Sequence, residues 1–287
     1  VQQGTQGLVM RTIANEIPSF ETLGLPSILK DLIMAKTGLI VMVGGTGSGK
    51  STSMASMLDH RNENSYGHII TIEDPIEYVH KHKNCVVMQR EVGVDTDDWE
   101  VALHNTLRQA PDVIVLGEIR DKEIMNFGIE FAQTGHLALA TLHANNANQA
   151  IDRILGFFST ETQVKLMQDL SLNVRAIISQ RLIKTVDGGR CAAIEILINT
   201  PLISDLIAKG DVSGIKPIMA KSRELGMQTF DQAIFALYQQ GRISYEEALR
   251  NADSANELRL QIKLASGEDN SSNGLSLTST DDHEDAD

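Results

Sequence analysis

The sequence predicts an α/β fold, with a sheet covered on both faces by helices. Two observations lead to this prediction. From Gly38 onward, short apolar segments alternate with segments of helical periodicity. A glycine-rich turn joins the first of these apolar segments to a helix. With 287 residues, 42% of them hydrophobic, the chain is long enough to bury a core in one large domain or two modest ones.

The first residues indicate the end of another domain and a linker. Residues 8–13 predict a short strand that has no partner strand before it. The segment that follows is interrupted by prolines, and Ser19 or Thr22 is expected to cap a short helix that ends near Met34. We therefore expect residues 1–17 to be the end of an N-terminal domain together with its linker.

Strands and helices then alternate along the core. Residues 97–110 carry apolar side chains at helical spacing, and residues 122–135 predict a second helix that Gly135 ends as a C-cap. We interpret Trp99 as a packing residue of the first helix rather than a binding residue. The predicted strands are Leu39–Val43, His68–Ile72, Val113–Leu116 and Leu137–Thr141.

The last third of the chain differs from the core. Residues 181–186 and 190–198 flank the tight-turn sequence Asp-Gly-Gly and predict a β-hairpin. From Thr200 onward, apolar residues recur every three or four positions between glycines, which predicts short helices. The predicted division is a core at 18–199 and a helical subdomain at 200–264.

Charge is unevenly distributed along the chain. The formal net charge is −13, and residues 265–287 hold seven acids and no Lys or Arg, which leaves about −6 for the rest. A chain with this much negative charge is not expected to bind nucleic acid directly. The acidic tail, residues 265–287, is almost free of apolar residues and predicts disorder. A solubilising extension is favoured over a partner-binding segment.

Cysteine content and hydropathy exclude several classes of protein. Cys85 and Cys191 are the two cysteines, too few for a disulfide framework or a zinc quartet, which favours a reducing, cytosol-like compartment. The N-terminal residues lack the basic and apolar regions of a signal peptide. No apolar run reaches the roughly 18 residues of a membrane span. We therefore expect a cytoplasmic protein without a transmembrane segment, which reaches a membrane only through a partner.

The first motif that indicates a chemical function is GGTGSGKST, residues 44–52. Between a strand and a helix, it satisfies the phosphate-binding pattern G-x-x-x-x-G-K-[ST]. Its backbone N–H groups can face phosphates at the helix N-terminus, Lys50 reaches the β- and γ-phosphates, and Ser51 offers a hydroxyl to Mg²⁺. This loop alone does not distinguish kinases, GTPases and motors. The predicted nucleotide-binding residues in it are Gly45, Thr46, Gly47, Ser48, Gly49, Lys50, Ser51 and Thr52.

Two of the predicted strands end in carboxylates. After the second strand come Glu73, Asp74 and Glu77. A carboxylate placed there can polarise a water in line with the γ-phosphate, although the residues alone suit a solvated acidic loop equally well. The strand at 113–116 ends in Glu118, which resembles a Walker B acid that holds Mg²⁺ through a water.

Two histidines bracket the strand at 137–141. His136 stands before it and His143 after it, and no third ligand lies at a spacing that would make a metal site. Both are candidates for sensing the nucleotide, with an ordinary structural role as the alternative.

In order and separation, the four motifs resemble the Walker A, Asp box, Walker B and His box of the secretion and type IV pilus ATPases over residues 38–198, and a looser likeness continues to Leu264. Extension and secretion members usually carry a four-cysteine zinc insertion that this chain lacks. The chain therefore resembles the retraction branch, the PilT/PilU family, and residues 89–121 and 257–264 are most similar to PilU-type members.

This resemblance implies a RecA-like P-loop ATPase core, preceded by the remnant of a PAS-like domain. It also implies a homohexameric ring that hydrolyses ATP with Mg²⁺ to power pilus retraction, and hence twitching motility and DNA uptake. Such a ring would act at an inner-membrane pilus platform protein, which makes the location peripheral to that membrane.

The resemblance also assigns roles at the site. Glu77 is the implied general base and Glu118 the Walker B acid, so the implied catalytic residues are Glu77, Glu118 and Lys50. The implied Mg²⁺ ligands are Ser51 and, via water, Glu118. His136 and His143 occupy the His-box positions. Cations from a neighbouring subunit complete such sites, and the candidates here are Arg11, Arg108, Arg120 and Arg153.

One stretch departs from the family pattern. Retraction ATPases carry Ala-Ile-Arg-Asn-Leu-Ile in the helical subdomain, and here residues 202–207 read LISDLI, with Ser204 and Asp205 at the Arg and Asn positions. The change favours an accessory motor that works with a PilT-type ATPase ring. Two alternatives stay open: a nucleotide-dependent ring or coupling module with little hydrolysis of its own, and a pilus-extension ATPase.

Overall fold

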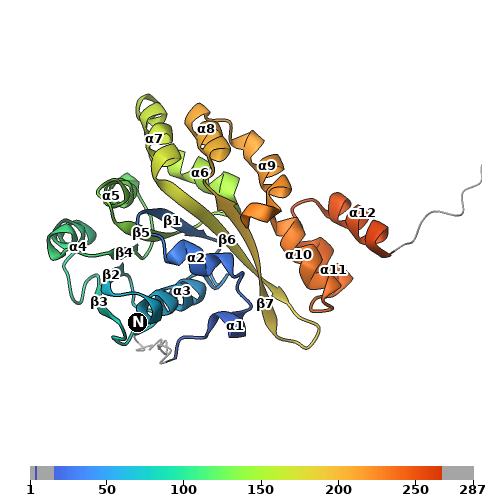
Figure 1. Cartoon of the computed structure of the whole chain (residues 1–287), viewed down its shortest axis with the longest axis horizontal. Coiled ribbons are helices and arrows are strands. Elements are labelled where there is room, and N and C mark those ends of the chain that lie inside the picture. Colours follow the sequence, from blue (N-terminus) through green and yellow to red (C-terminus); the bar gives the residue numbers. More distant parts are fainter. Residues whose placement is uncertain (1–3, 5–15, 267–287) are drawn as a thin grey trace, which may run out of the picture.

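The computed structural model describes Gly4 and residues 16–266. In this part of the chain, seven strands form one sheet in the order β3-β2-β4-β5-β1-β6-β7 (Figure 1). Neighbouring strands are parallel, except for the antiparallel pair β6 and β7. The strands are β1 (Gly38–Val43), β2 (Gly67–Glu73), β3 (Cys85–Glu91), β4 (Val113–Leu116), β5 (Leu137–Leu142), β6 (Val174–Lys184) and β7 (Arg190–Ile198). The predicted α/β class is confirmed.

Sequence patterns located most of these strands. β1, β2, β4 and β5 match the four predicted strands to within one residue at each end, and the predicted hairpin is formed by β6 and β7. Two features differ. β6 begins at Val174 rather than at 181, and β3 was not predicted. The predicted strand at 8–13 and the acidic tail beyond Ser266 lie outside the described residues.

The first helices depart from the prediction of a single helix near Met34. Gly24 takes a left-handed conformation with φ 64° and ends α1 (Phe20–Leu23), which Ser19 caps. The chain then forms α2 (Ile28–Ile33). The helix at 97–110 is confirmed as α4 (Trp99–Thr106), extended by a single 3₁₀ turn. The other helices before residue 200 are α3 (Lys50–Asn64), α5 (Lys122–Gln133), α6 (Ala147–Leu155) and α7 (Thr160–Asn173).

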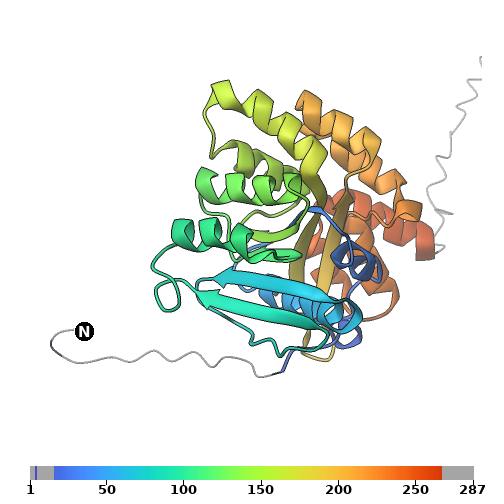
Figure 2. The same ribbon diagram turned by 60° about the vertical axis from the view of Figure 1, so that its left-hand side comes forward.

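The sheet lies between two helical layers (Figure 2). Along β1, Leu39 and Val41 belong to the hydrophobic cluster beneath α4 to α7, whereas Ile40 and Met42 belong to the cluster beneath α2 and α3. This two-residue alternation explains why β1 is apolar along its whole length, as expected for a central parallel strand.

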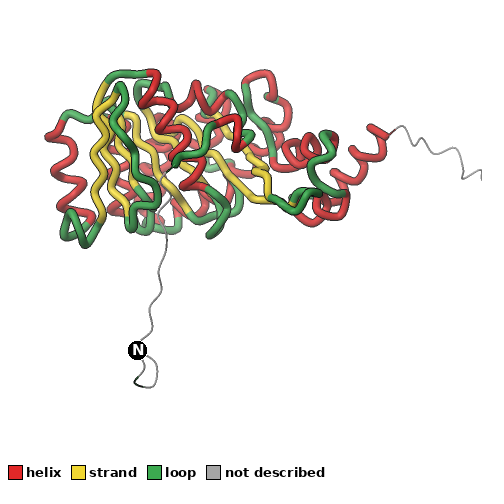
Figure 3. Tube along the Cα trace, turned by 90° about the horizontal axis from the view of Figure 1, so that it is seen from below, coloured by secondary structure: helices red, strands yellow, loops and turns green. Residues whose placement is uncertain are grey.

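The C-terminal helices pack in two places. α8 (Pro201–Lys209) and α9 (Ile215–Lys221) contribute to the same cluster as α5 to α7. By contrast, α10 (Phe230–Gln239), α11 (Tyr245–Asn251) and α12 (Ala255–Ser266) form a third cluster with Ile183, Cys191 and Ala193 of the hairpin. They lie beyond the sheet (Figure 3). The predicted domain boundaries stay predictions. None of the helices in the described part combines the length and apolarity that a membrane span needs.

Candidate nucleotide site

The predicted motifs meet at one edge of the sheet. Parallel strands present their carboxyl ends on the same side, so the residues that follow β1, β2, β4 and β5 gather there. A cavity of ≈ 680 Å³ opens at this edge. Residues 46–52, residues 73–78, Glu118 and His143 all line it. Trp99 packs against the main hydrophobic cluster, as expected for a packing residue, and it also lines the cavity.

The phosphate-binding loop is held in place by Gln180, a residue outside the sequence motif. Gln180 of β6 is 2% exposed; its Nε2 donates to the Ser48 carbonyl oxygen at 2.9 Å, and its Oε1 accepts from Ser53 Oγ at 2.8 Å. Gln180 therefore joins the loop to the first turn of α3. Sequence reasoning missed it because 132 positions separate Gln180 from Ser48.

We expect Gly49→Ala to destabilise the protein. Gly49 has φ +86°, and a Cβ there would lie 2.7 Å from Gln180 Nε2, so backbone strain and overpacking add. The expected loss is about 2–4 kcal/mol in the free energy of unfolding, measured by urea denaturation. Gly45→Ala is the matched control, because nothing lies within 4 Å of its added Cβ. Equal losses in the two variants would contradict the role given to Gln180.

Lys50 is folded back onto its own loop. It is 8% exposed, and its Nζ donates to the carbonyl oxygens of Gly44 at 2.7 Å and Gly45 at 3.0 Å. Burial lowers the pKa of Lys50, while the carboxylates of Glu118 and Glu77 act to raise it. The structure thus brings the lysine and both predicted catalytic acids within electrostatic range of one another. Phosphate oxygens would be stronger, charge-assisted acceptors for this ammonium than carbonyl oxygens.

The acidic residues after β2 differ in their surroundings. Glu73 accepts from Thr71 Oγ1 at 2.7 Å and from Gln89 Nε2 at 3.1 Å. Burial raises the pKa of Glu73 more than these hydrogen bonds lower it. Glu73 is therefore tied to the sheet, and it also accepts a hydrogen bond from the backbone of Glu77, four residues further along the loop in the cavity wall. The Asp74–Pro75 peptide bond between them is cis.

Glu118 lies between a cation and a histidine. Arg120 donates from Nε to Glu118 Oε2 at 3.1 Å and from a terminal nitrogen to Asp74 Oδ2 at 3.0 Å. His143 Nε2 lies 3.3 Å from Glu118 Oε1. The hydrogen bond to Glu118 is the main reason that the pKa of Arg120 is raised. These contacts connect the ends of β2, β4 and β5 across the cavity.

The other predicted residues lie elsewhere. His136 is at the amino end of β5, where its Nδ1 is 3.0 Å from Thr134 Oγ1 and 3.2 Å from the Phe131 carbonyl oxygen. Because a strand rises about 3.3 Å per residue, His136 and His143 are at opposite edges of the sheet. Of the four candidate arginines, Arg120 lines the cavity, Arg108 lies in the 3₁₀ turn after α4, Arg153 stacks on Phe157, and Arg11 is outside the described residues.

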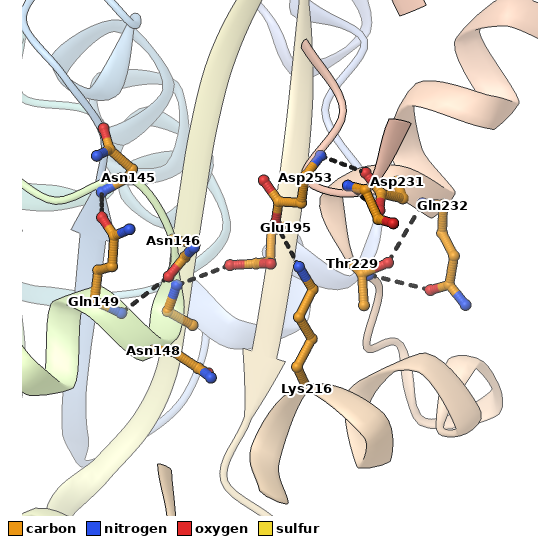
Figure 4. A network of polar contacts seen from close by, with 12 residues as sticks. Asn145, Asn146, Asn148, Gln149, Glu195, Lys216, Thr229, Asp231, Gln232 and Asp253 are labelled. Atoms are coloured by element: carbon orange, nitrogen blue, oxygen red, sulfur yellow. Dashed lines mark hydrogen bonds and ion pairs between the residues drawn. The ribbon is translucent and has the colours of Figure 1, made fainter. Parts of the chain in front are cut away.

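The loop after His143 is fixed by a polar network (Figure 4). The Ala147 N–H, in the first turn of α6, donates to Glu195 Oε1 of β7 at 2.8 Å. Burial raises the pKa of Glu195. Arg181 of β6 donates to the Asn145 carbonyl oxygen at 3.2 Å and pairs with Asp253 Oδ1 at 2.7 Å. The loop that presents His143 is thus connected to the segment between α11 and α12.

A second cavity of ≈ 640 Å³ adjoins the first turn of α3 and shares Gly49, Thr52, Leu182 and Arg190 with the first. Its lining includes three cations and no carboxylate. The cations are Lys184, Arg190 and Arg242. In a chain with a net charge of −13, this basic wall beside the phosphate-binding loop favours an anionic ligand.

The residues present fit a nucleotide and Mg²⁺. Ser48 Oγ is buried in the glycine loop without a hydrogen-bond partner in the described structure, as expected where a ligand supplies the partner. Ser51 and Glu118 line the same cavity and offer oxygen atoms. Within residues 16–266 no group of three His, Cys, Asp or Glu side chains could hold a metal by itself. A Mg²⁺ ion here would therefore depend on phosphate oxygens of the nucleotide.

Comparisons with known proteins agree with this geometry. Residues 3–199 match the model of a family described as type II/IV secretion system protein. The chain is 58% identical to the type IV pilus ATPase PilU of Pseudomonas aeruginosa, over 98% of this chain and 75% of that protein. It is 43% identical to the retraction ATPase PilT of the same organism, over 86% and 72%. A crystal structure of the pilus retraction motor PilT with bound ADP superposes with a TM-score of 0.82 at 44% identity, covering 87% of this chain and 71% of that one.

Proposed function

The chain belongs to the type II/IV secretion system protein family, in the PilT and PilU branch of type IV pilus retraction ATPases, and from this premise we propose that six copies form a ring-shaped motor. The protein is an ATPase associated with type IV pilus retraction. The ring acts at the inner-membrane pilus platform protein, beside a PilT-type ATPase ring, and supports twitching motility and DNA uptake. The similarity to named pilus ATPases supports the motor role, and the contacts of α8 support the accessory role.

In this proposal the phosphate-binding loop and Lys50 bind the β- and γ-phosphates of ATP. Lys50 exchanges the Gly44 and Gly45 carbonyl oxygens for phosphate oxygens, which are charged acceptors. Ser51 and, through a water, Glu118 would hold Mg²⁺. When bound, the ion neutralises phosphate charge. The second, basic cavity adjoins this loop at Gly49 and Thr52, so its three cations add positive potential beside the negatively charged phosphates.

Glu77, His143 and Arg120 have the remaining roles in this proposal. Glu77, in the cavity wall, takes the proton of the water that attacks the γ-phosphate. His143 contacts Glu118 directly and so can sense the nucleotide at the phosphate end of the site. Arg120 already spans Glu118 and Asp74 of its own subunit. The cation supplied by a neighbouring subunit is therefore a different residue.

The accessory role rests on α8. Ile203 and Ile207 are buried, and Ser204 Oγ donates to the Ser171 carbonyl oxygen of α7 at 2.7 Å. Asp205 pairs with Lys209 at 2.6 Å within the same helix. In retraction ATPases that act alone, the resemblance places arginine and asparagine at 204 and 205. Here Ser204 replaces the arginine and packs α8 onto α7, so the positive charge at that position is lost. Asp205 adds a negative charge where the family has a neutral asparagine.

Retraction in cells tests this function. In strains with and without the PilT-type ATPase, we expect the wild-type chain to increase the rate or force of pilus retraction only when that partner is present. Glu77→Gln should abolish the increase, because hydrolysis by this chain supplies it. Retraction without the partner would overturn the accessory role. If the Glu77→Gln variant still increases retraction, a coupling module with little hydrolysis of its own is favoured instead. If deleting the gene for this chain removes pili from the cell surface, a role in extension is favoured.

A further inference from the structure

The two halves of the candidate site come from different parts of the sheet. Lys50 and Ser51 stand at the start of α3, whereas Glu77 lies in the loop that joins β2 to β3. Hydrolysis needs the base in a fixed place relative to the bound phosphates, and a misplacement of about 1 Å can cost roughly 100-fold in rate. A contact between the loop and α3 close to Glu77 would therefore matter for catalysis.

The loop is fixed to β3 through its backbone. The Ile76 N–H donates to Glu91 Oε2 at 3.0 Å. Gln89 donates to the Tyr78 carbonyl oxygen at 2.8 Å and accepts from the His80 N–H at 2.7 Å. Through these bonds, Glu91 and Gln89 of β3 hold the backbone on both sides of Glu77. The residues held are Ile76, Tyr78 and His80. These contacts set the position of the loop on the sheet, but they do not reach α3.

The Tyr78 side chain makes the connection to α3. Its hydroxyl lies 2.9 Å from Thr52 Oγ1, and both groups are partly buried in the cavity lining. Tyr78 directly follows Glu77, and Thr52 directly follows Ser51. The hydrogen bond therefore joins the immediate neighbours of the proposed base and the proposed Mg²⁺ ligand. A threonine hydroxyl has one proton and two lone pairs, so Thr52 can keep this bond and still contact a ligand.

Other contacts between this segment and α3 are further from Glu77. Asn62 donates to the Lys81 carbonyl oxygen at 2.7 Å, and Lys83 pairs with Asp59 at 2.8 Å. Both lie near the middle or end of α3, several residues beyond the first turn. They attach the end of the segment to the helix, whereas the bond between Tyr78 and Thr52 lies beside the phosphate-binding loop.

We propose that Tyr78 is a positioning residue for ATP hydrolysis: its hydrogen bond to Thr52 sets the place of Glu77 relative to the bound phosphates. The inference rests on the proposed role of Glu77 as the base. Removing the bond leaves the phosphate contacts of the loop intact, so it should affect the chemical step rather than nucleotide binding.

Steady-state ATP hydrolysis by the full chain tests this proposal. Tyr78→Phe removes only the hydroxyl, and we expect kcat to fall about three- to tenfold, the worth of one hydrogen bond, while KM for ATP changes less than twofold. Thr52→Val should lower kcat similarly, and the double variant should be no slower than the slower single variant. Thr52→Ser, which keeps the hydroxyl, should lose less of kcat than Thr52→Val does. Tyr66→Phe is the control, since Tyr66 is 83% exposed.

Each alternative result is decisive when the unfolding midpoints of the variants agree. An unchanged kcat in Tyr78→Phe overturns the proposal, as do kcat losses that multiply in the double variant. A raised KM with unchanged kcat overturns it in favour of a nucleotide-binding role for Tyr78. If Tyr78→Phe slows hydrolysis but Glu77→Gln does not, Tyr78 does not act through Glu77, and the proposal is overturned. The same result would show that Glu77 is not the base, while the ATPase activity itself would still stand.

Discussion

Replacing Glu77 by glutamine should lower kcat for ATP hydrolysis by about 100- to 10,000-fold, the range typical of a lost general base. The amide has the shape of the carboxylate but cannot take a proton from the attacking water. Because the backbone of the loop is held by Gln89 and Glu91, the site should keep its geometry. Phosphate release measures the rate, and fluorescence of a labelled ATP analogue measures the affinity, which should change little.

The control for Glu77→Gln is Glu100→Gln, which removes a carboxylate whose side chain is 80% exposed on α4. It should hydrolyse ATP at the wild-type rate. A Glu77→Gln variant that keeps more than a tenth of the wild-type kcat would show that another group accepts the proton. Glu73 would be the next acid to test, since its raised pKa gives it a greater affinity for a proton.

Replacing Lys50 by methionine should abolish nucleotide binding and hydrolysis together. Lys50 is the cation of the phosphate-binding loop: its ammonium donates to two backbone carbonyl oxygens and lies within electrostatic range of Glu77 and Glu118. Methionine keeps the length and the apolar stem but leaves the phosphates facing Glu77 and Glu118 without a countercharge. We expect kcat/KM to fall at least about 1,000-fold, which corresponds to roughly 4 kcal/mol of lost transition-state stabilisation.

Thermal unfolding with and without Mg²⁺ and ATP checks the binding half of this prediction. A ligand that binds only the folded state raises Tm by mass action, so the wild-type Tm should rise with ATP concentration and that of Lys50→Met should not. Lys36→Met, which removes an exposed lysine before β1, should respond like the wild type. An equal rise in Lys50→Met would mean that the nucleotide is held without the lysine.

The central strands could be predicted because burial on both faces forces them to be apolar. β1 and β4 are buried almost throughout, and their bounds followed from composition alone. β3 is different: it is an edge strand in which buried Cys85 and Val87 alternate with exposed Val86 and Met88, and the residues before it are charged. Because the exposed Val86 and Met88 are themselves apolar, the sequence shows no alternation of polar and apolar residues, and this, with the polar residues before it, concealed the strand. Its side chains nevertheless hold the loop that carries Glu77.

The motif residues could be predicted to meet because parallel strands end at one edge, but their partners could not. The contacts of Gln180 with Ser48 and of Tyr78 with Thr52 join distant parts of the chain and depend on side-chain conformations that no local pattern encodes. His136 shows the opposite case. A strand of six residues separates it from His143, so strand geometry alone predicts that the two histidines lie at opposite edges.

The hairpin of β6 and β7 has a consequence for how this chain can be divided or recombined. Ile183 and Cys191 are buried under α10 to α12, and Arg181 lies over the ring of Phe230. A fragment that stopped after β7 would leave these apolar side chains facing water and an arginine without its carboxylate. The smallest exchangeable module between related motors is therefore the hairpin together with its helices, and a chimera joined at residue 200 would need its hairpin redesigned.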